Sequence, residues 1–194
     1  MLRIIAGQYR GRKLEAPALK STRPTTDRVR ENMFNLVESY LVSQNLCWED
    51  ITGLDAFAGS GALGCEALSR GIKHMTFFEQ NPQAFATIKR NVSHLLPEDS
   101  GSPQKNSSVT KYFRIDATKP PKTDLPVDLV FLDPPYGKNL CHHCVMGLTK
   151  KGWLKPGSLL VLETALQDPL SPFLQNLSIE SRHYGDTKID LLLT

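Results

Sequence analysis

Short apolar runs alternate with segments of helical periodicity along most of the chain, beginning near residue 51. The apolar runs predict strands at 51–57, 74–79, 109–115, 127–132 and 158–163. The segments between them predict helices at 62–69, 82–95 and 140–148. Strands that alternate with helices are typical of a parallel sheet with helices on both faces. Two last runs, 178–184 and 187–193, predict an antiparallel hairpin, so we expect an α/β fold that ends in an antiparallel pair.

The first 45 residues follow a different pattern, and we expect an extension (1–45) ahead of the α/β domain (46–194). Residues 2–16 predict a short hairpin with Gly7 and Gly11 as its turn residues.

A helix is predicted to follow, capped by Thr25 or Thr26. Its apolar positions are expected to pack onto the domain: Val29, Met33, Leu36, Val37, Tyr40 and Leu41. The opposite face, which carries Arg28, Arg30 and Glu31, is expected to stay in contact with water.

The composition is typical of a globular protein that does not cross a membrane. The 194 residues fit one domain with an appendage, and 40% hydrophobic with 22% charged residues is ordinary for a soluble globular protein. No window approaches 18 uncharged apolar residues and the amino terminus lacks a signal-peptide core, so we expect a cytoplasmic protein without a membrane partner. Four cysteines do not indicate a disulfide scaffold, and reduced thiols are expected.

The net charge of +3 hides an asymmetry: residues 1–30 carry a net +6 and the remainder −3. A basic amino-terminal segment on a mildly acidic body indicates contact with a polyanion, although a solvated arm would have the same charge. The expected nucleic-acid contacts are Arg10, Arg12, Lys13, Arg23, Arg28 and Arg30.

A glycine-rich loop follows the first predicted strand. Gly59, Gly61 and Gly64 match the G-x-G-x-x-G fingerprint of dinucleotide sites, so a dehydrogenase is a competing interpretation. A pyrophosphate needs positive potential at the helix amino terminus, whereas Asp55 places a negative charge nearby. S-adenosylmethionine carries a sulfonium and an ammonium instead of phosphate, and a carboxylate favours it. We therefore expect S-adenosylmethionine as the cofactor.

Two further acids follow strands. Glu79 is expected to accept the ribose hydroxyls of an adenosine ligand, and Asp116 to lie near the adenine amine, although either could be a solvated strand-end residue. The expected cofactor contacts are Asp55, Phe57, Gly59, Ser60, Gly61, Ala62, Leu63, Glu79, Gln80, Asp116 and Ala117.

Asp133-Pro134-Pro135-Tyr136 follows the fourth predicted strand, where ligands of open α/β sheets bind. The prolines stiffen the chain and leave its carbonyls free to accept hydrogen bonds. Such a corner can hold a flat ring with an amine, although a proline-rich turn is the simpler interpretation. We expect Asp133 and the Pro134 carbonyl to orient the amine and Tyr136 to stack on the ring, with Asp133 acting as an acceptor and not as a strong base.

Cys141-His142-His143-Cys144 looks like a metal site. Four adjacent residues on one helical turn cannot all face one tetrahedral ion, and no second Cys or His cluster exists in the sequence. No metal is expected.

These motifs resemble the class I amino-methyltransferases, which share the Asp133-Pro134-Pro135-Tyr136 pattern. The chain is similar in particular to the RsmD-type 16S ribosomal RNA (guanine-N2)-methyltransferases. Nearly the whole chain carries this resemblance, through Arg3-Ile4-Ile5-Ala6-Gly7, Arg10-Gly11-Arg12, Arg23-Pro24-Thr25, Asp27-Arg28-Val29-Arg30-Glu31, Phe34-Asn35, the loop Asp55 to Gly64, and Tyr184-Gly185-Asp186-Thr187.

The resemblance implies a Rossmann-like, seven-stranded methyltransferase fold with S-adenosylmethionine as donor. It also implies a guanine N2 of 16S rRNA as acceptor, in an assembled or assembling small ribosomal subunit. By the same resemblance, residues 23–31 lie near the cofactor and help to shape the target-base pocket. The long insertion at 97–108 departs from the family pattern.

Two alternatives remain open. A DNA adenine or cytosine amino-methyltransferase uses the same chemistry, but usually needs a target-recognition region for which this chain leaves little room. A non-catalytic RNA-binding module would explain the basic segment and leave the glycine loop and Asp133 without a role.

Overall fold

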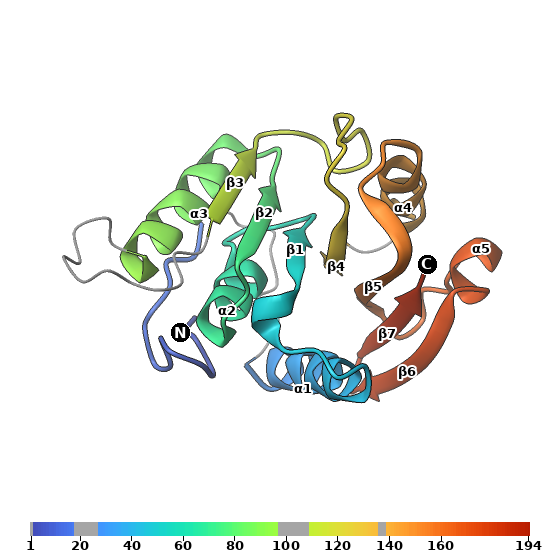
Figure 1. Ribbon diagram of the computed structural model, residues 1–194, viewed down its shortest axis with the longest axis horizontal. Helices are drawn as coiled ribbons and strands as arrows, with labels where there is room; N and C mark the ends of the chain where they lie inside the picture. Colours follow the sequence, from blue (N-terminus) through green and yellow to red (C-terminus); the bar gives the residue numbers. More distant parts are fainter. Residues whose placement is uncertain (1, 18–26, 97–108, 136–138) are drawn as a thin grey trace.

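A computed structural model describes residues 2–17, 27–96, 109–135 and 139–194. Its centre is a seven-stranded sheet in the order β3-β2-β1-β4-β5-β7-β6 (Figure 1). The strands are β1 (Thr52–Asp55), β2 (His74–Phe78), β3 (Val109–Phe113), β4 (Val127–Leu132), β5 (Leu154–Ala165), β6 (Ser178–Tyr184) and β7 (Thr187–Leu193). Strands β1 to β5 are parallel, and β7 lies antiparallel between β5 and β6. The expected mostly parallel sheet with an antiparallel carboxyl-terminal hairpin is confirmed.

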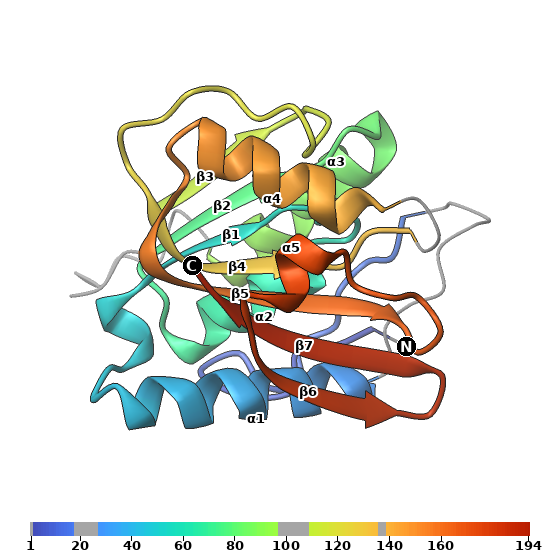
Figure 2. The ribbon, with the colours of Figure 1, turned by 90° about the vertical axis from the view of Figure 1, so that its right-hand side faces the viewer.

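Helices cover both faces of this sheet, because the buried strands are apolar on both sides. They are α1 (Asp27–Ser43), α2 (Ala62–Arg70), α3 (Pro82–Leu95), α4 (Leu140–Lys150) and α5 (Pro172–Gln175), with a 3₁₀ turn at Trp48–Asp50. On β4, Leu129 and Phe131 pack with α1, α2 and α3, whereas Val130 and Leu132 pack with α4 and α5. Figure 2 shows α1 and α4 on opposite sides of the sheet. Among the described residues, no helix is long and apolar enough to cross a membrane.

Most predicted boundaries agree with the structure, and α3, β4, β6 and β7 agree at both ends. Strand β1 ends at Asp55, two residues early, because the chain turns there into the glycine loop. Strand β5 is longer than predicted, since it pairs with β7 as far as Ala165. The short helix α5 was not predicted, because four residues carry no periodicity; Ser171 caps it by accepting a hydrogen bond from Leu174 N–H.

The amino-terminal segment, residues 2–17, is a reduced form of the predicted hairpin. One antiparallel bridge joins Arg3 to Lys13. Gly7 turns the chain at φ +81°, and a Cβ there would overlap the Ser69 carbonyl of α2. The predicted turn at Gly7 therefore also sets a close contact with the α/β body. The predicted caps Thr25 and Thr26 lie outside the described residues.

Helix α1 buries its predicted stripe, including Met33, Val37 and Leu41, and it also buries Arg30. The expectation that Arg30 stays in water is wrong, since the side chain is 1% exposed. Its Nη2 donates to the Arg3 carbonyl at 2.6 Å and to Asp27 at 3.0 Å, because the amino-terminal segment folds over this turn of the helix. Burial lowers the pKa of the guanidinium, and the nearby Asp27 and Glu66 charges oppose that shift.

Residues on both sides of the expected boundary after residue 45 share one apolar cluster, with Ile4, Phe34 and Trp48 packed beside Phe131. The division into 1–45 and 46–194 stays a prediction.

Candidate functional site

Acidic side chains collect at the carboxyl ends of the parallel strands. The register aligns Asp55 of β1 with Phe77 of β2 and Phe131 of β4, and Phe131 with Val161 of β5. Side chains alternate between faces, so positions two residues further on share this face. Those positions include Glu79, Asp133 and Glu163, which therefore leave neighbouring strand ends on the same side as Asp55.

The glycine loop lies between Asp55 and α2 and is bonded to the end of β2. Gly59 (φ +54°) and Gly61 (φ +77°) adopt left-handed geometry that disfavours other residues. The Glu79 carboxylate accepts the Gly59 N–H at 2.9 Å and the Asn81 N–H at 2.7 Å. Gly64 has a packing role, because a Cβ there would overlap the Phe77 ring.

Asp55 lies beneath this loop and is 1% exposed. Its Oδ2 accepts the Gly64 N–H at 3.0 Å, near the amino terminus of α2, where negative charge is favoured. Burial raises the pKa of Asp55 to about 7; the Gly64 hydrogen bond opposes this shift, and the charges of Asp133 and Glu79 add to it. The acid is therefore poised to change charge near neutral pH, next to two other carboxylates.

The remaining expected cofactor residues lie around the same strand ends. Asp116 accepts hydrogen bonds from Thr118 N–H at 2.9 Å and Thr118 Oγ1 at 2.7 Å, and these bonds lower its pKa although burial raises it. The structure places the others in the glycine loop, at the start of α2 or directly after β2 and β3: Phe57, Ser60, Ala62, Leu63, Gln80 and Ala117.

Asn91 of α3 is a positioning residue that sequence reasoning missed. Its buried side-chain amide donates to the Ser60 carbonyl at 2.8 Å and to the Glu15 carbonyl at 3.0 Å, and its oxygen accepts the Glu15 N–H. It therefore joins the glycine loop to the amino-terminal segment. A lone Asn on a helix gives no such signal in sequence, because both partners are distant along the chain.

Asp133, Pro134 and Pro135, which we call the Asp133 corner, lie directly after β4 on the other side of the site. Asp133 is half-buried, Pro134 is buried and Pro135 is exposed, whereas Tyr136 lies outside the described residues. Burial raises the pKa of the nearby Cys141 thiol to about 12, and the Asp133 and Asp190 charges contribute. The Asp133 carboxylate thus lies within electrostatic reach of both Asp55 and Cys141.

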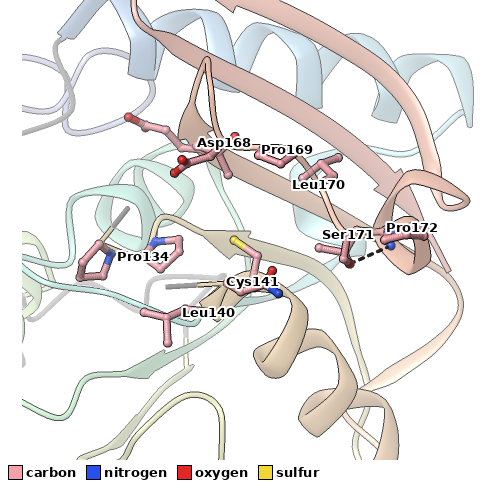
Figure 3. A pocket seen from close by; sticks show the side chains of 13 residues that line it. Pro134, Leu140, Cys141, Asp168, Pro169, Leu170, Ser171 and Pro172 are labelled. Carbon is pink, nitrogen blue, oxygen red and sulfur yellow. Dashed lines mark hydrogen bonds between the residues drawn. The ribbon is translucent and has the colours of Figure 1, made fainter. Parts of the chain in front are cut away.

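A cavity of about 440 Å³ begins at this corner. Figure 3 shows Pro134, Leu140 and Cys141 on one side and Asp168 to Pro172 on the other. Glu163 and Thr164, at the end of β5, also line it.

The Cys-His-His-Cys run does not converge. Cys141 and Cys144 are buried in the sheet-facing side of α4, while His142 Nδ1 contacts Ser171 Oγ at 2.9 Å and His143 Nδ1 contacts the Asn139 carbonyl at 3.0 Å. Within the described ranges, no group of three His, Cys, Asp or Glu side chains could hold a metal ion.

The expected nucleic-acid residues have different surroundings. Arg10, Lys13 and Arg28 are exposed. Arg12 is also exposed, but it donates to the His94 carbonyl at 2.8 Å and lies 4.8 Å from the Tyr9 ring centre. Arg23 lies outside the described residues. Arg30, being buried, is not placed to contact a phosphate, so its expected role is wrong.

The sequence is similar to a protein family and to named rRNA methyltransferases. The family model described as conserved hypothetical protein 95 matches residues 2–193. The Haemophilus influenzae protein named ribosomal RNA small subunit methyltransferase D is 40% identical over 169 residues, or 87% of this chain and 81% of that protein. Its Escherichia coli namesake is 35% identical over 178 residues, covering 92% and 82%.

The fold of the chain is similar to those of solved methyltransferase structures. The Escherichia coli structure of yhhF has a TM-score of 0.74 and 31% identity, and the match covers 99% of this chain and 97% of that one. An RNA methyltransferase from Salinibacter ruber in complex with S-adenosyl-L-homocysteine has a TM-score of 0.62 at 13% identity, covers 88% and 93%, and shows the shared fold.

Proposed function

Since the chain belongs to the conserved hypothetical protein 95 family, together with the ribosomal RNA small subunit methyltransferases D, we propose that it methylates 16S rRNA. The donor is S-adenosylmethionine, and the acceptor is the exocyclic N2 of a guanine in an assembled or assembling small ribosomal subunit. The place of action is the cytoplasm.

One observation carries the proposal: the Asp133-Pro134 corner stands at the end of β4, directly beside the strand that leads into the glycine loop. A donor held by the loop and an amine held by the corner are then neighbours. Ligands of open α/β sheets bind at such strand ends.

The residues around the loop fit S-adenosylmethionine. Gly59 and Gly61 give the loop its left-handed turns, and the acids Asp55 and Glu79 supply negative potential for a sulfonium and an ammonium. In the proposal Glu79 accepts the ribose hydroxyls, and Asp116 with Ala117 borders the adenine. Phosphate of a dinucleotide would meet this negative potential unfavourably.

Asp133 and the Pro134 carbonyl orient the amine. The N2 lone pair of guanine is delocalised into the ring, so two N–H acceptors must turn it toward the donor. When bound, S-adenosylmethionine supplies an electrophilic methyl group, and N2 gives up one proton in exchange. Asp133 need not remove that proton early, because it becomes acidic only as N2 gains the methyl group. Tyr136 is proposed to stack on the base.

Methyl-label transfer tests the proposal. Small ribosomal subunits from cells that lack the enzyme are expected to accept label from S-adenosylmethionine, and nuclease digestion should yield N2-methylguanosine. Duplex DNA serves as the comparison, because a DNA amino-methyltransferase would label it. Absence of calorimetric binding to both S-adenosylmethionine and S-adenosylhomocysteine would contradict the enzyme hypothesis.

Replacing Asp133 with Ala is expected to lower the rate of transfer by about 100- to 1,000-fold, the usual loss for one oriented electrostatic contact. Affinity for S-adenosylhomocysteine should change little, because Asp133 is proposed to hold the acceptor. Single-turnover transfer and calorimetry measure the two effects. A near-parental rate in Asp133→Ala would show that the amine is oriented by other groups.

A further inference from the structure

The cavity beside the Asp133 corner has a polar wall that the proposed transfer leaves without a role. Its volume of about 440 Å³ is within the usual range for small-ligand sites. Glu163 and Thr164 line it from the end of β5 and are 3% and 9% exposed. Glu163 therefore places a buried carboxylate in the wall of this cavity.

Glu163 is the neighbour of Asp133 in the sheet. Leu132 of β4 pairs in register with Leu162 of β5, and the next residue on each strand is the acid. Both side chains leave the sheet on the face that Asp55 occupies. On its other side Glu163 pairs with Ile189, which is buried and apolar. The Glu163 carboxylate therefore lines the cavity next to the strand end that carries Asp133.

Guanine is the base whose edge matches these two acids. It presents N1–H and the two N2–H groups in a row, and a carboxylate can accept N1–H while neighbouring acceptors take the two N2–H groups. Adenine and cytosine present an unprotonated ring nitrogen next to their amine, so a carboxylate would face a lone pair. Buried polar groups left unpaired in this way reject the wrong ligand strongly.

We propose that Glu163 selects guanine by accepting N1–H, while the two N2–H groups are left to Asp133 and the Pro134 carbonyl. The assignment deepens the proposed function and rests on it. Contacts that Glu163 makes within the protein are compatible with this role, since a carboxylate offers about four acceptor sites.

An RNA carrying 2-aminopurine at the modified position tests the role. This base keeps the exocyclic amine but has an unprotonated N1. Small subunits reconstituted with either base are compared in single-turnover transfer. The wild-type protein is expected to prefer guanine by about 100-fold or more, as sites that hydrogen-bond one ligand do.

Glu163→Gln should change this preference, because the amide N–H can donate to the unprotonated N1. Its rate on guanine is expected to fall by about 100-fold, and its rate on 2-aminopurine to rise above that of wild type. Glu180→Gln is the matched control, since Glu180 lies on β6 and pairs with Arg182 at 2.7 Å. That variant should retain the wild-type preference.

The outcomes separate the two proposals. A wild-type product other than N2-methylguanosine overturns the proposed function and the role of Glu163 with it. With the correct product, equal wild-type rates on the two bases overturn the role of Glu163 alone, and this comparison needs no variant. A Glu163→Gln protein that gains nothing on 2-aminopurine, or that loses affinity for S-adenosylhomocysteine, overturns it as well.

Discussion

Asp55 is a buried carboxyl with a pKa near 7, and its surroundings make a prediction about cofactor binding. Burial and the neighbouring acids disfavour its charge, whereas a sulfonium and an ammonium favour it. Affinity for S-adenosylmethionine should therefore increase from about pH 5.5 to 7, by up to about tenfold per pH unit. Asp55→Asn keeps an acceptor for Gly64 N–H and should flatten the increase. Calorimetry at several pH values measures it.

Asp124→Asn is a suitable control for this titration, because Asp124 is exposed on the loop before β4. It should follow the wild-type pH dependence. Stability gives an independent readout: a raised carboxyl pKa means that the folded state binds more protons than the unfolded state between about pH 4 and 7, so the unliganded protein loses stability as pH rises through that range. An Asp55→Asn variant with wild-type pH dependence in both measurements would contradict the role of this carboxyl.

Residues whose partners are close along the chain, or that end strands, could be interpreted from the sequence, whereas a residue with a distant partner could not. Glu79, Asp116 and Asp133 were predicted as site residues because each ends or follows an apolar run, and Asp55 because it precedes the glycine loop. Parallel strands bring their carboxyl ends together. Arg30 was placed on the wrong face because its partner, the Arg3 carbonyl, is 27 residues away. Nothing in a local pattern reveals that a separate segment will cover one turn of a helix.

At the scale of elements, the amino-terminal segment depends on Glu66 of α2. Glu66 is fully buried and accepts the Ile5 N–H at 2.7 Å, the Ala6 N–H at 2.9 Å and Arg70 Nε at 3.2 Å. Glu66→Ala leaves these donors unpaired and should lower the free energy of unfolding by about 3–5 kcal/mol. Urea denaturation measures the loss, and hydrogen exchange at residues 4–14 should accelerate.

Glu38→Ala provides the matched control for Glu66. Glu38 also pairs with Arg70, at 2.8 Å, but its side chain is 52% exposed. A solvent-exposed ion pair contributes about 1 kcal/mol or less, so this variant should unfold almost as wild type does. Equal losses in the two variants would mean that the segment is held mainly by its apolar contacts.

Elements were predicted well where periodicity is long, as in α3 and the β6–β7 hairpin, and less well where neighbours decide the boundary. Strand β5 extends beyond its apolar run because β7 pairs with it. The amino-terminal hairpin keeps backbone hydrogen bonds between residues 2–4 and 11–14, but it forms a single bridge because the Ile5, Ala6 and Tyr9 N–H groups bond to Glu66 and Ser69. In both cases tertiary contacts override the local pattern.

At the scale of the whole molecule, the basic amino-terminal segment lies on the α1–α3 side of the sheet, and α4 lies on the other. Because this segment packs against the rest of the protein, only some of its basic residues are suitable for testing the expected RNA contact. Arg12 is unsuitable, because its hydrogen bond to the His94 carbonyl holds the end of α3. Arg10 and Lys13 are exposed and serve better.

Replacing Arg10 and Lys13 together with Ala should weaken binding to small ribosomal subunits and reduce the slope of log affinity against log salt by about 2, one for each phosphate that the variant no longer neutralises. Replacing Lys150 and Lys151, exposed at the end of α4, removes the same charge from the opposite side and should leave the slope unchanged. Equal changes in both double variants would indicate a general effect of net charge. A slope that changes only with Arg10 and Lys13 would place the RNA backbone along the segment that Glu66 and Asn91 hold against the catalytic body.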